Sequence, residues 1–223
     1  FLYRSQGKYE AAETLYLQAL ELKKSILGEN HPSYATSLNN LAFLYTSQGK
    51  YEEAEALYLQ ALELYKSILG ENHPDYAQSL NNLAYLYKSQ RKYEVAESLY
   101  IQALELRKQL LGENYSQYAS SLNLLAGLYY SQGKYEEAEP IITKALELRK
   151  SIFGENHPDY ASSLNNLALL YYSQGKYEAA ELLYIQALEI CDRALGSNHP
   201  NTVTCRENLE NLRKQQRENR DNS

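Results

Sequence analysis

A repeat with a period of 42 residues constrains the fold of this chain more than any other feature. The tripeptide Gly-Lys-Tyr, once with arginine in place of glycine, occurs at residues 7–9, 49–51, 91–93, 133–135 and 175–177. The dipeptide His-Pro follows the same step at residues 31–32, 73–74, 157–158 and 199–200, with Tyr115-Ser116 in the remaining place. Residues 31–72 and 73–114 are identical at 31 of 42 positions. Such a period predicts a solenoid, because a unit this short buries its apolar face only by stacking on its neighbours.

Each unit is predicted to contain two helices. Apolar residues at i, i+3, i+4 and i+7 indicate a first helix from about His31 to Gln48, with a buried stripe on Leu38, Leu41, Ala42 and Tyr45. After Gly49-Lys50 a second helix follows, and its apolar face is Ala54, Leu57, Tyr58, Ala61, Leu64, Tyr65 and Ile68. Gly70 favours the conformation that ends a helix, and Pro74 suits the first turn of the next one. No segment alternates with a period of two, so we expect an all-α protein.

The period also predicts the domain organisation. Residues 1–198 are expected to be tandem helical hairpins, divided as 1–30 (truncated), 31–72, 73–114, 115–156 and 157–198. Residues 199–223 are expected to form a polar capping helix and tail, which gives about eleven helices with the first a stub. The chain contains no methionine and opens in the middle of a unit, so we interpret it as a fragment of a longer protein. Arg91 replaces the glycine of its turn, which predicts a turn that is either strained or differently shaped.

Composition and spacing disfavour several classes of function. A net charge of −6 disfavours a nucleic-acid partner, and no apolar run approaches the roughly 20 residues of a membrane span. No signal-like segment is present, and Cys191 and Cys205 have no metal-ligand spacing, so we expect reduced thiols in a cytoplasmic protein. Both cysteines flank the turn at Gly196–His199, so they are candidates to face each other across a helical hairpin.

The sequence carries no recognisable catalytic constellation. The four histidines lie in equivalent turns, and residues one stacked repeat apart cannot converge within about 2 Å of one metal ion. The acidic pairs Glu52-Glu53 and Glu136-Glu137 open second helices, where negative charge complements the helix dipole. We find no nucleophile–base set, glycine-rich phosphate loop or cofactor fingerprint. The expectation is therefore a protein that is not an enzyme and has no cofactor and no metal site.

The pattern L-NN-LA-LY-QGKYEEAE-LY-QALEL resembles the tetratricopeptide repeat, whose signature positions match Leu38, Leu41, Ala42, Tyr45, Gly49, Tyr51, Ala54, Tyr58 and Ala61. The usual repeat has about 34 residues, whereas here the second helix runs about eight residues further. This long variant, with LNNLA, QGKYEEAE, QALEL and LGENHPDYA, is most similar to the repeats of kinesin light chain, and such arrays also occur in bacterial proteins. The resemblance implies a right-handed superhelix whose first helices line a concave groove.

Two adjacent asparagines in the middle of three of the first helices, at residues 39–40, 81–82 and 165–166, point to a binding function. In SLNNLAFLY, residues 37–45, Asn40 lies about 200° from Leu38 on a helical wheel and so opposes the buried stripe. The resemblance places that face in the groove, where Asn40, Asn82, Asn166 and Asn208 would form a ladder that Leu124 interrupts. A carboxamide can pair with both the C=O and the N–H of an extended peptide, and the resemblance implies this role. The alternative is that the asparagines bond between repeats or face water, and we favour it for Asn39 and its equivalents.

Other positions on the same face would set selectivity. Phe43, Tyr85, Gly127 and Leu169 share one repeat position and differ in size, and Gly127 should leave an open pocket beside Leu124. The groove positions Thr36, Gln78, Ser120 and Ser162 are uncharged. They therefore disfavour the carboxylate clamp with which some tetratricopeptide domains hold chaperone tails.

Two functions from different classes fit these observations. The first is a scaffold that binds an extended peptide segment of a protein partner in the groove. The second is a structural array that self-associates or acts as a spacer within a multidomain protein. It is favoured by an uncapped apolar N-terminal end at Phe1, Leu2, Tyr3, Leu15 and Ile26.

Overall fold

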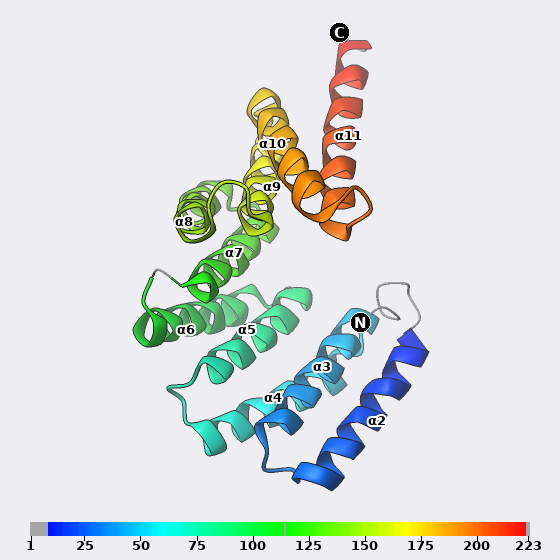
Figure 1. Ribbon diagram of the computed structural model, residues 1–223, viewed down its shortest axis with the longest axis vertical. Coiled ribbons are helices and arrows are strands. Elements are labelled where there is room, and N and C mark those ends of the chain that lie inside the picture. Colours follow the sequence, from blue (N-terminus) through cyan, green and yellow to red (C-terminus); the bar gives the residue numbers. More distant parts are fainter. Residues whose placement is uncertain (1–8, 114, 222–223) are drawn as a thin grey trace. The chain divides into compact units, whose positions relative to one another are not determined.

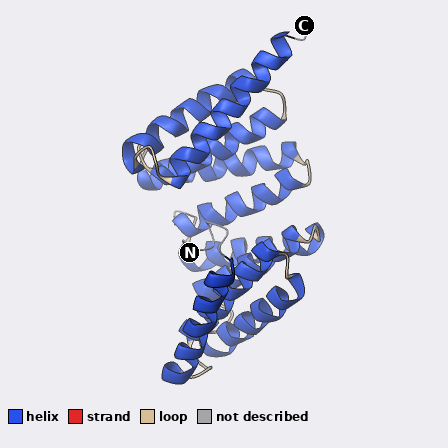
Figure 2. Cartoon of the chain, turned by 90° about the vertical axis from the view of Figure 1, so that its right-hand side faces the viewer, coloured by secondary structure: helices blue, strands red, loops and turns tan. Residues whose placement is uncertain are grey.

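The chain folds entirely into helices, as the repeat pattern predicts. The computed structural model describes residues 9–113 and 115–221, and within them it contains ten helices and no strand (Figure 2). The stub helix that we expected at the N-terminus falls on residues 1–8, outside the described residues. None of the described helices is long and apolar enough to cross a membrane.

The helices form stacked hairpins in two compact units (Figure 1). Residues 1–112 contain α2 (Tyr9–Leu27), α3 (Pro32–Gln48), α4 (Tyr51–Leu69), α5 (Pro74–Ser89) and α6 (Tyr93–Leu111). Residues 113–223 contain α7 (Ser116–Ser131), α8 (Tyr135–Phe153), α9 (Pro158–Ser173), α10 (Tyr177–Leu195) and α11 (Pro200–Asp221). The odd-numbered helices are the first helices of their repeats, and the even-numbered helices are the second. The expected solenoid of helical hairpins is therefore observed within each unit.

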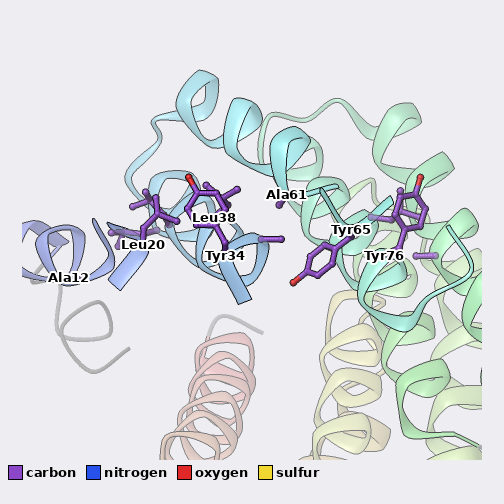
Figure 3. Packing of buried hydrophobic residues seen from close by; sticks show 12 residues of the cluster. Ala12, Leu20, Tyr34, Leu38, Ala61, Tyr65 and Tyr76 are labelled. Carbon is purple, nitrogen blue, oxygen red and sulfur yellow. The ribbon is translucent and has the colours of Figure 1, made fainter. Parts of the chain in front are cut away.

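Alanines allow the two helices of a hairpin to lie close together. Ala42 on α3 and Ala54 and Ala61 on α4 are completely buried, and so are their counterparts in the following repeats. Larger side chains fill the space beside them: Figure 3 shows Tyr34 and Leu38 of α3 in the same cluster as Ala61 and Tyr65 of α4. Tyr76 of α5 and Leu20 of α2 join this cluster, so one core links successive hairpins of the first unit.

A half-buried carboxylate on a second helix also holds the next hairpin in place, as seen on α2 and α8. Glu13 on α2 accepts hydrogen bonds from Tyr45 Oη (3.1 Å), Gln48 Nε2 (3.2 Å) and Lys50 Nζ (3.1 Å) at the end of α3. Glu139 on α8 makes the same three bonds to Tyr171, Gln174 and Lys176. Burial alone would raise the pKa of both carboxyl groups, but these hydrogen bonds and the lysine charge outweigh it and lower the pKa.

The lowered pKa values predict acid sensitivity. A carboxyl group whose pKa is lower in the folded than in the unfolded state stabilises the fold above about pH 4.5, and this stability is lost as the pH falls further. Glu139→Gln should therefore reduce the pH dependence of the unfolding free energy between about pH 3 and pH 5. Urea titrations at several pH values measure this. Glu147→Gln, on the exposed face of the same helix, is the control, and an unchanged slope in Glu139→Gln would contradict the prediction.

The histidines before the prolines cap the first helices, a role that the sequence analysis did not predict. Nδ1 of His31, His73 and His157 accepts a hydrogen bond from the backbone N–H two residues later, each at 3.1 Å. His199 does the same at 3.2 Å. The bond requires a neutral ring with its proton on Nε2. Tyr115 occupies the equivalent place before α7 with a similar backbone conformation but makes no side-chain cap bond.

Tyr115→His should therefore supply the missing cap. Because an N-cap bond contributes about 1 kcal/mol and Tyr115 is 53% exposed, the gain should exceed the lost packing. We expect the unfolding free energy from urea titration to rise by about 0.5–1 kcal/mol. His157→Ala should lower it by a similar amount. No change in either variant would show that these histidines contribute nothing as caps.

The turn between α5 and α6 has the same left-handed backbone conformation as the other hairpin turns, although it contains arginine in place of glycine. Gly49 adopts φ 77°, the left-handed conformation that closes α3. Arg91 adopts φ 60° in the same turn after α5 and is the one non-glycine residue with positive φ among those described. Of the two alternatives that the sequence left open, the strained turn is the one observed, at a cost of about 1 kcal/mol.

The last helix presents polar residues where earlier first helices are apolar. Arg206, Glu210 and Arg213 on α11 occupy the repeat positions of Leu164, Ala168 and Tyr171 on α9. Arg213 Nε donates to Glu181 Oε1 at 2.7 Å, in place of the tyrosine bond of the other repeats. This composition favours a helix that ends the array, and the capping role stays a prediction.

Candidate functional site

The first asparagine of each pair is mainly a structural residue. Asn39 and Asn81 are 7% and 1% exposed. The side chain of Asn39 lies 3.4 Å from Ser79 Oγ on the next first helix. In the second unit Asn123 Nδ2 donates to the carbonyl of Ala119 at 3.0 Å and reaches Ser163 Oγ at 3.5 Å. These asparagines therefore connect neighbouring first helices, as the alternative interpretation proposed.

The second asparagine lies at the surface and keeps bonding capacity. Asn166 Nδ2 donates to Asn123 Oδ1 at 3.3 Å, and Asn208 Nδ2 donates to Asn165 Oδ1 at 3.0 Å. A carboxamide has two N–H groups and an acceptor oxygen, so each bond leaves one N–H and Oδ1 for other partners. In the first unit Asn40 is exposed, and Asn82 Oδ1 accepts from Gln78 Nε2 at 2.9 Å. Asn166 and Asn208 thus connect repeats and also keep groups that can bond outward.

The twelve predicted groove residues lie on the first helices, six in each unit. We call this surface the first-helix face. In the first unit it comprises Thr36, Asn40, Phe43, Gln78, Asn82 and Tyr85, and in the second Ser120, Leu124, Ser162, Asn166, Leu169 and Asn208. Thr36, Asn40 and Gln78 are exposed, and the other nine are half-buried.

Second helices also contribute to this face, which the sequence analysis missed. Tyr65 Oη lies 2.8 Å from Thr36 Oγ1. Arg107 Nη2 donates to Gln78 Oε1 at 2.6 Å, and Arg149 Nη2 approaches Ser120 Oγ at 3.5 Å. Burial lowers the pKa of both guanidinium groups. The sequence did contain a signal for this contribution, because one position of the second helix differs in residue type from repeat to repeat. Its residues are Tyr65, Arg107, Arg149 and Cys191.

Where the fourth repeat has a cysteine at this position, a polar cavity opens. It has a volume of about 140 Å³ and is lined by Ser162, Asn165, Asn166, Asn201, Thr204 and Cys205. Cys205 and Cys191 of α10 lie in the same buried cluster. Burial raises the pKa of Cys205 to about 12 and also raises that of Cys191. Both thiols are therefore protonated near neutral pH, so neither is an activated nucleophile.

A second cavity lies at Gly127, as the sequence predicted, although its walls differ from those expected. It has a volume of about 100 Å³ and is lined by Asn123, Ala126, Gly127, Tyr130, Ile142, Asn166 and Leu169. Leu124 is not among these residues, and the apolar walls come from α7, α8 and α9. In the first unit the equivalent place is closed, because the rings of Phe43 and Tyr85 lie 5.4 Å apart.

A third cavity continues the series toward the end of the chain. It has a volume of about 370 Å³ and is lined by Leu169, Tyr172, Tyr184, Asn208, Asn211, Lys214, Gln215 and Glu218. Leu169 is shared with the cavity at Gly127, and Asn166 is shared between that cavity and the polar one. The first-helix face of the second unit therefore carries three cavities, and neighbouring cavities share a lining residue.

The described residues contain no cluster of side chains that could bind a metal ion. Within residues 9–113 and 115–221, no three His, Cys, Asp or Glu side chains come together as a possible metal site. The histidines serve as helix caps, and the acidic pairs Glu52-Glu53 and Glu136-Glu137 lie in the first turns of α4 and α8.

Stacked helical hairpins with an open first-helix face define a scaffold for protein interaction, a fold that is typically non-catalytic. The sequence profile of the tetratricopeptide repeat matches residues 1–67, 38–109, 75–148 and 117–192. The chain belongs to the tetratricopeptide repeat family. A search of curated proteins found no match.

Solved structures with the same fold include arrays of the kinesin light chain type. BtubC (BKLC) from P. vanneervenii is 32% identical, over 89% of this chain and 79% of that chain, with a TM-score of 0.68. A putative kinesin light chain from Podosopora anserina with nearly identical repeats is 25% identical, over 86% of this chain and 90% of that chain, with a TM-score of 0.66. A Rap protein in complex with Competence and Sporulation Factor is 21% identical, over 95% of this chain and 61% of that chain, with a TM-score of 0.72. The likeness to Rap shows the fold alone.

Proposed function

We propose that this chain is a scaffold that holds an extended peptide segment of a protein partner along its first-helix face. The observation that carries the proposal is the set of three cavities in the second unit that share lining residues, with Asn166 and Asn208 among these. Cavities supply room for side chains, and the spare carboxamide groups supply bonds to main chain. An extended peptide needs both.

The asparagines would recognise the peptide backbone and not its sequence. The free N–H of Asn166 would donate to a peptide C=O, and its Oδ1 would accept from a peptide N–H. With Asn208 acting in the same way, four bonds at about 1 kcal/mol each supply about 4 kcal/mol. Side chains in the cavities add to this, and ordering of the peptide takes part of it back. The expected dissociation constant is micromolar or weaker.

The comparisons support a protein partner in general terms. The family is that of interaction scaffolds, and the Rap protein, which has the same fold, is seen in complex with Competence and Sporulation Factor. On the first-helix face of the first unit, Asn40 and Asn82 would act as Asn166 and Asn208 do in the second. Glu139 and its equivalents bond to neighbouring hairpins, so they would position the face without touching the ligand.

Replacing two asparagines tests the proposal. Asn166→Ala with Asn208→Ala removes the carboxamides, and we expect the affinity for a peptide selected from a random library to fall at least tenfold, which corresponds to about 1.4 kcal/mol. Isothermal titration calorimetry measures this. Gln186→Ala removes a carboxamide from the exposed side of α10 and should leave the affinity unchanged.

The melting temperature distinguishes binding from stability. The two substitutions lose bonds to Asn123 and Asn165 but gain helix propensity of up to about 0.7 kcal/mol per residue, so it should change little. A sharp fall would show that the asparagines act mainly as connections between repeats. An unchanged affinity would exclude the first-helix face of the second unit as the binding site.

A second candidate function is self-association, favoured by an uncovered face on α2. Leu22 and Ile26 are 59% and 69% exposed, and Leu15 is 51% exposed. Their equivalents Leu57, Leu64 and Ile68 on α4 are half-buried, since α4 packs against first helices of its own unit. Among the described residues nothing covers this face of α2, and Phe1, Leu2 and Tyr3 lie outside them. Two copies could bury the face by pairing their α2 helices.

Charge substitution on α2 tests this second candidate. If the face pairs copies, sedimentation equilibrium should show dimers at high micromolar concentration. Leu22→Glu with Ile26→Glu should restore monomers, because burying an ionised carboxylate in an apolar interface costs free energy. Leu182→Glu is the control, since Leu182 is equally exposed, at 70%, on α10. A wild-type chain that stays monomeric up to millimolar concentration would refute the candidate.

A further inference from the structure

We propose that the cavity at Gly127 is a subsite for one branched or flexible aliphatic side chain, that of Leu, Ile or Met, in the bound peptide. The inference rests on the proposed function and names the class of peptide that the second unit recognises. Below, the cavity of about 100 Å³ between α7, α8 and α9 is called the Gly127 cavity.

The Gly127 cavity exists because two repeat positions lose their rings. In the first unit, Phe43 lies against Tyr85, and the fully buried Tyr58 lies in the same cluster. At the same positions 84 residues later the chain has Gly127, Leu169 and Ile142. Loss of the phenyl and phenol groups removes the atoms that close this place in the first unit. The walls stay where they are, because Ala126 and Ala138 keep α7 and α8 packed together.

One aromatic ring that the first unit lacks, that of Tyr130, lines the Gly127 cavity at its side. Tyr130 replaces Thr46 of the first unit. Its hydroxyl lies 2.8 Å from Ser173 Oγ, and its ring centroid lies 5.6 Å from that of Tyr135. Held by both contacts, the Tyr130 ring forms one wall and leaves the centre open.

The lining selects an uncharged, apolar occupant. Ala126, Ile142, Leu169 and the ring of Tyr130 are apolar, and no lysine, arginine, aspartate or glutamate lines the cavity. A charged side chain would therefore lose its hydration without gaining a partner. Since a water molecule takes about 30 Å³ of liquid volume, 100 Å³ accommodates roughly three to four heavy atoms. The four side-chain carbons of leucine match this size, whereas the ring system of tryptophan exceeds it.

The polar residues of the cavity explain how such a side chain would be presented. Asn123 and Asn166 line it and bond to each other, which leaves Asn166 with one N–H and Oδ1. These groups can hold the peptide main chain beside the residue whose side chain enters the cavity. A side chain in the cavity, together with hydrogen bonds from Asn166 to the neighbouring main chain, would fix both the position and the register of the peptide.

The apolar area that the peptide side chain buries in the cavity predicts how much affinity is lost when that side chain is shortened. Each buried methylene is worth about 0.8 kcal/mol, or about fourfold in affinity. Leucine to alanine in the peptide removes three carbons, and because the cavity is open on one side we expect a loss of roughly 10- to 50-fold. A tryptophan at that position should bind no better than alanine.

The experiment starts from a phage-displayed library of random dodecapeptides selected on the full chain. We expect the selected peptides to share one position occupied by Leu, Ile or Met. A synthetic peptide from the selection is then titrated calorimetrically into wild type and Gly127→Leu. The introduced isobutyl group fills the cavity, so the affinity should fall at least tenfold. The melting temperature should rise, because leucine is a better helix former than glycine. Unfolding therefore cannot account for the loss.

Ala194→Leu is the matched control, since it also places a leucine side chain at an exposed position of α10, and it should leave the affinity unchanged. Selected peptides without a shared aliphatic position, or equal affinities for wild type and Gly127→Leu, would overturn the subsite. If Asn166→Ala with Asn208→Ala still weakened binding in that case, the groove itself would stand. A selection that yields no binding peptide would overturn the proposed function and the subsite together.

Discussion

The close approach of the two helices in each hairpin is the contact on which the rest of the structure depends. Ala42 on the first helix and Ala54 and Ala61 on the second are completely buried, and the same alanines recur in every described hairpin. A larger side chain at any of them would push the helices apart, because a packed core does not absorb even one added methylene freely. The tyrosines, the half-buried carboxylates and the first-helix face all lie on helices that this contact positions.

Because the repeats share this core, they can differ on the outside without a change of fold. Phe43, Tyr85, Gly127 and Leu169 occupy one position and range from a ring to no side chain. The position at Tyr65, Arg107, Arg149 and Cys191 varies in the same way and changes what lies beneath the first-helix face. In the second unit these changes open cavities at Gly127 and beside Cys205. Stability and the proposed binding therefore depend on different positions of one repeat.

Sequence reasoning placed the asparagines on the first-helix face but missed contacts that the structure shows. Asn166 was expected to serve a ligand, and it also donates to Asn123 of the preceding repeat. The histidines were interpreted as residues of turns, although their Nδ1 atoms cap helices. Arg149 was not predicted as part of the face because it lies on a second helix, whereas the predicted groove residues all lie on first helices. In each case the missing information is a distance between residues that lie far apart in the chain or point across a turn.

The 42-residue period, the apolar stripes and the glycine turns determined by themselves the helices, the hairpins and the face on which the asparagines lie, because these follow from local periodicity and backbone preference. The cavities were decided by the tertiary structure. Gly127 predicts a gap, but the size and walls of that gap depend on Ile142, Leu169 and Tyr130, which reach it from α8, from α9 and from a later turn of α7. Their side chains meet only once the helices have packed, since packing, not sequence spacing, determines which atoms fill a volume.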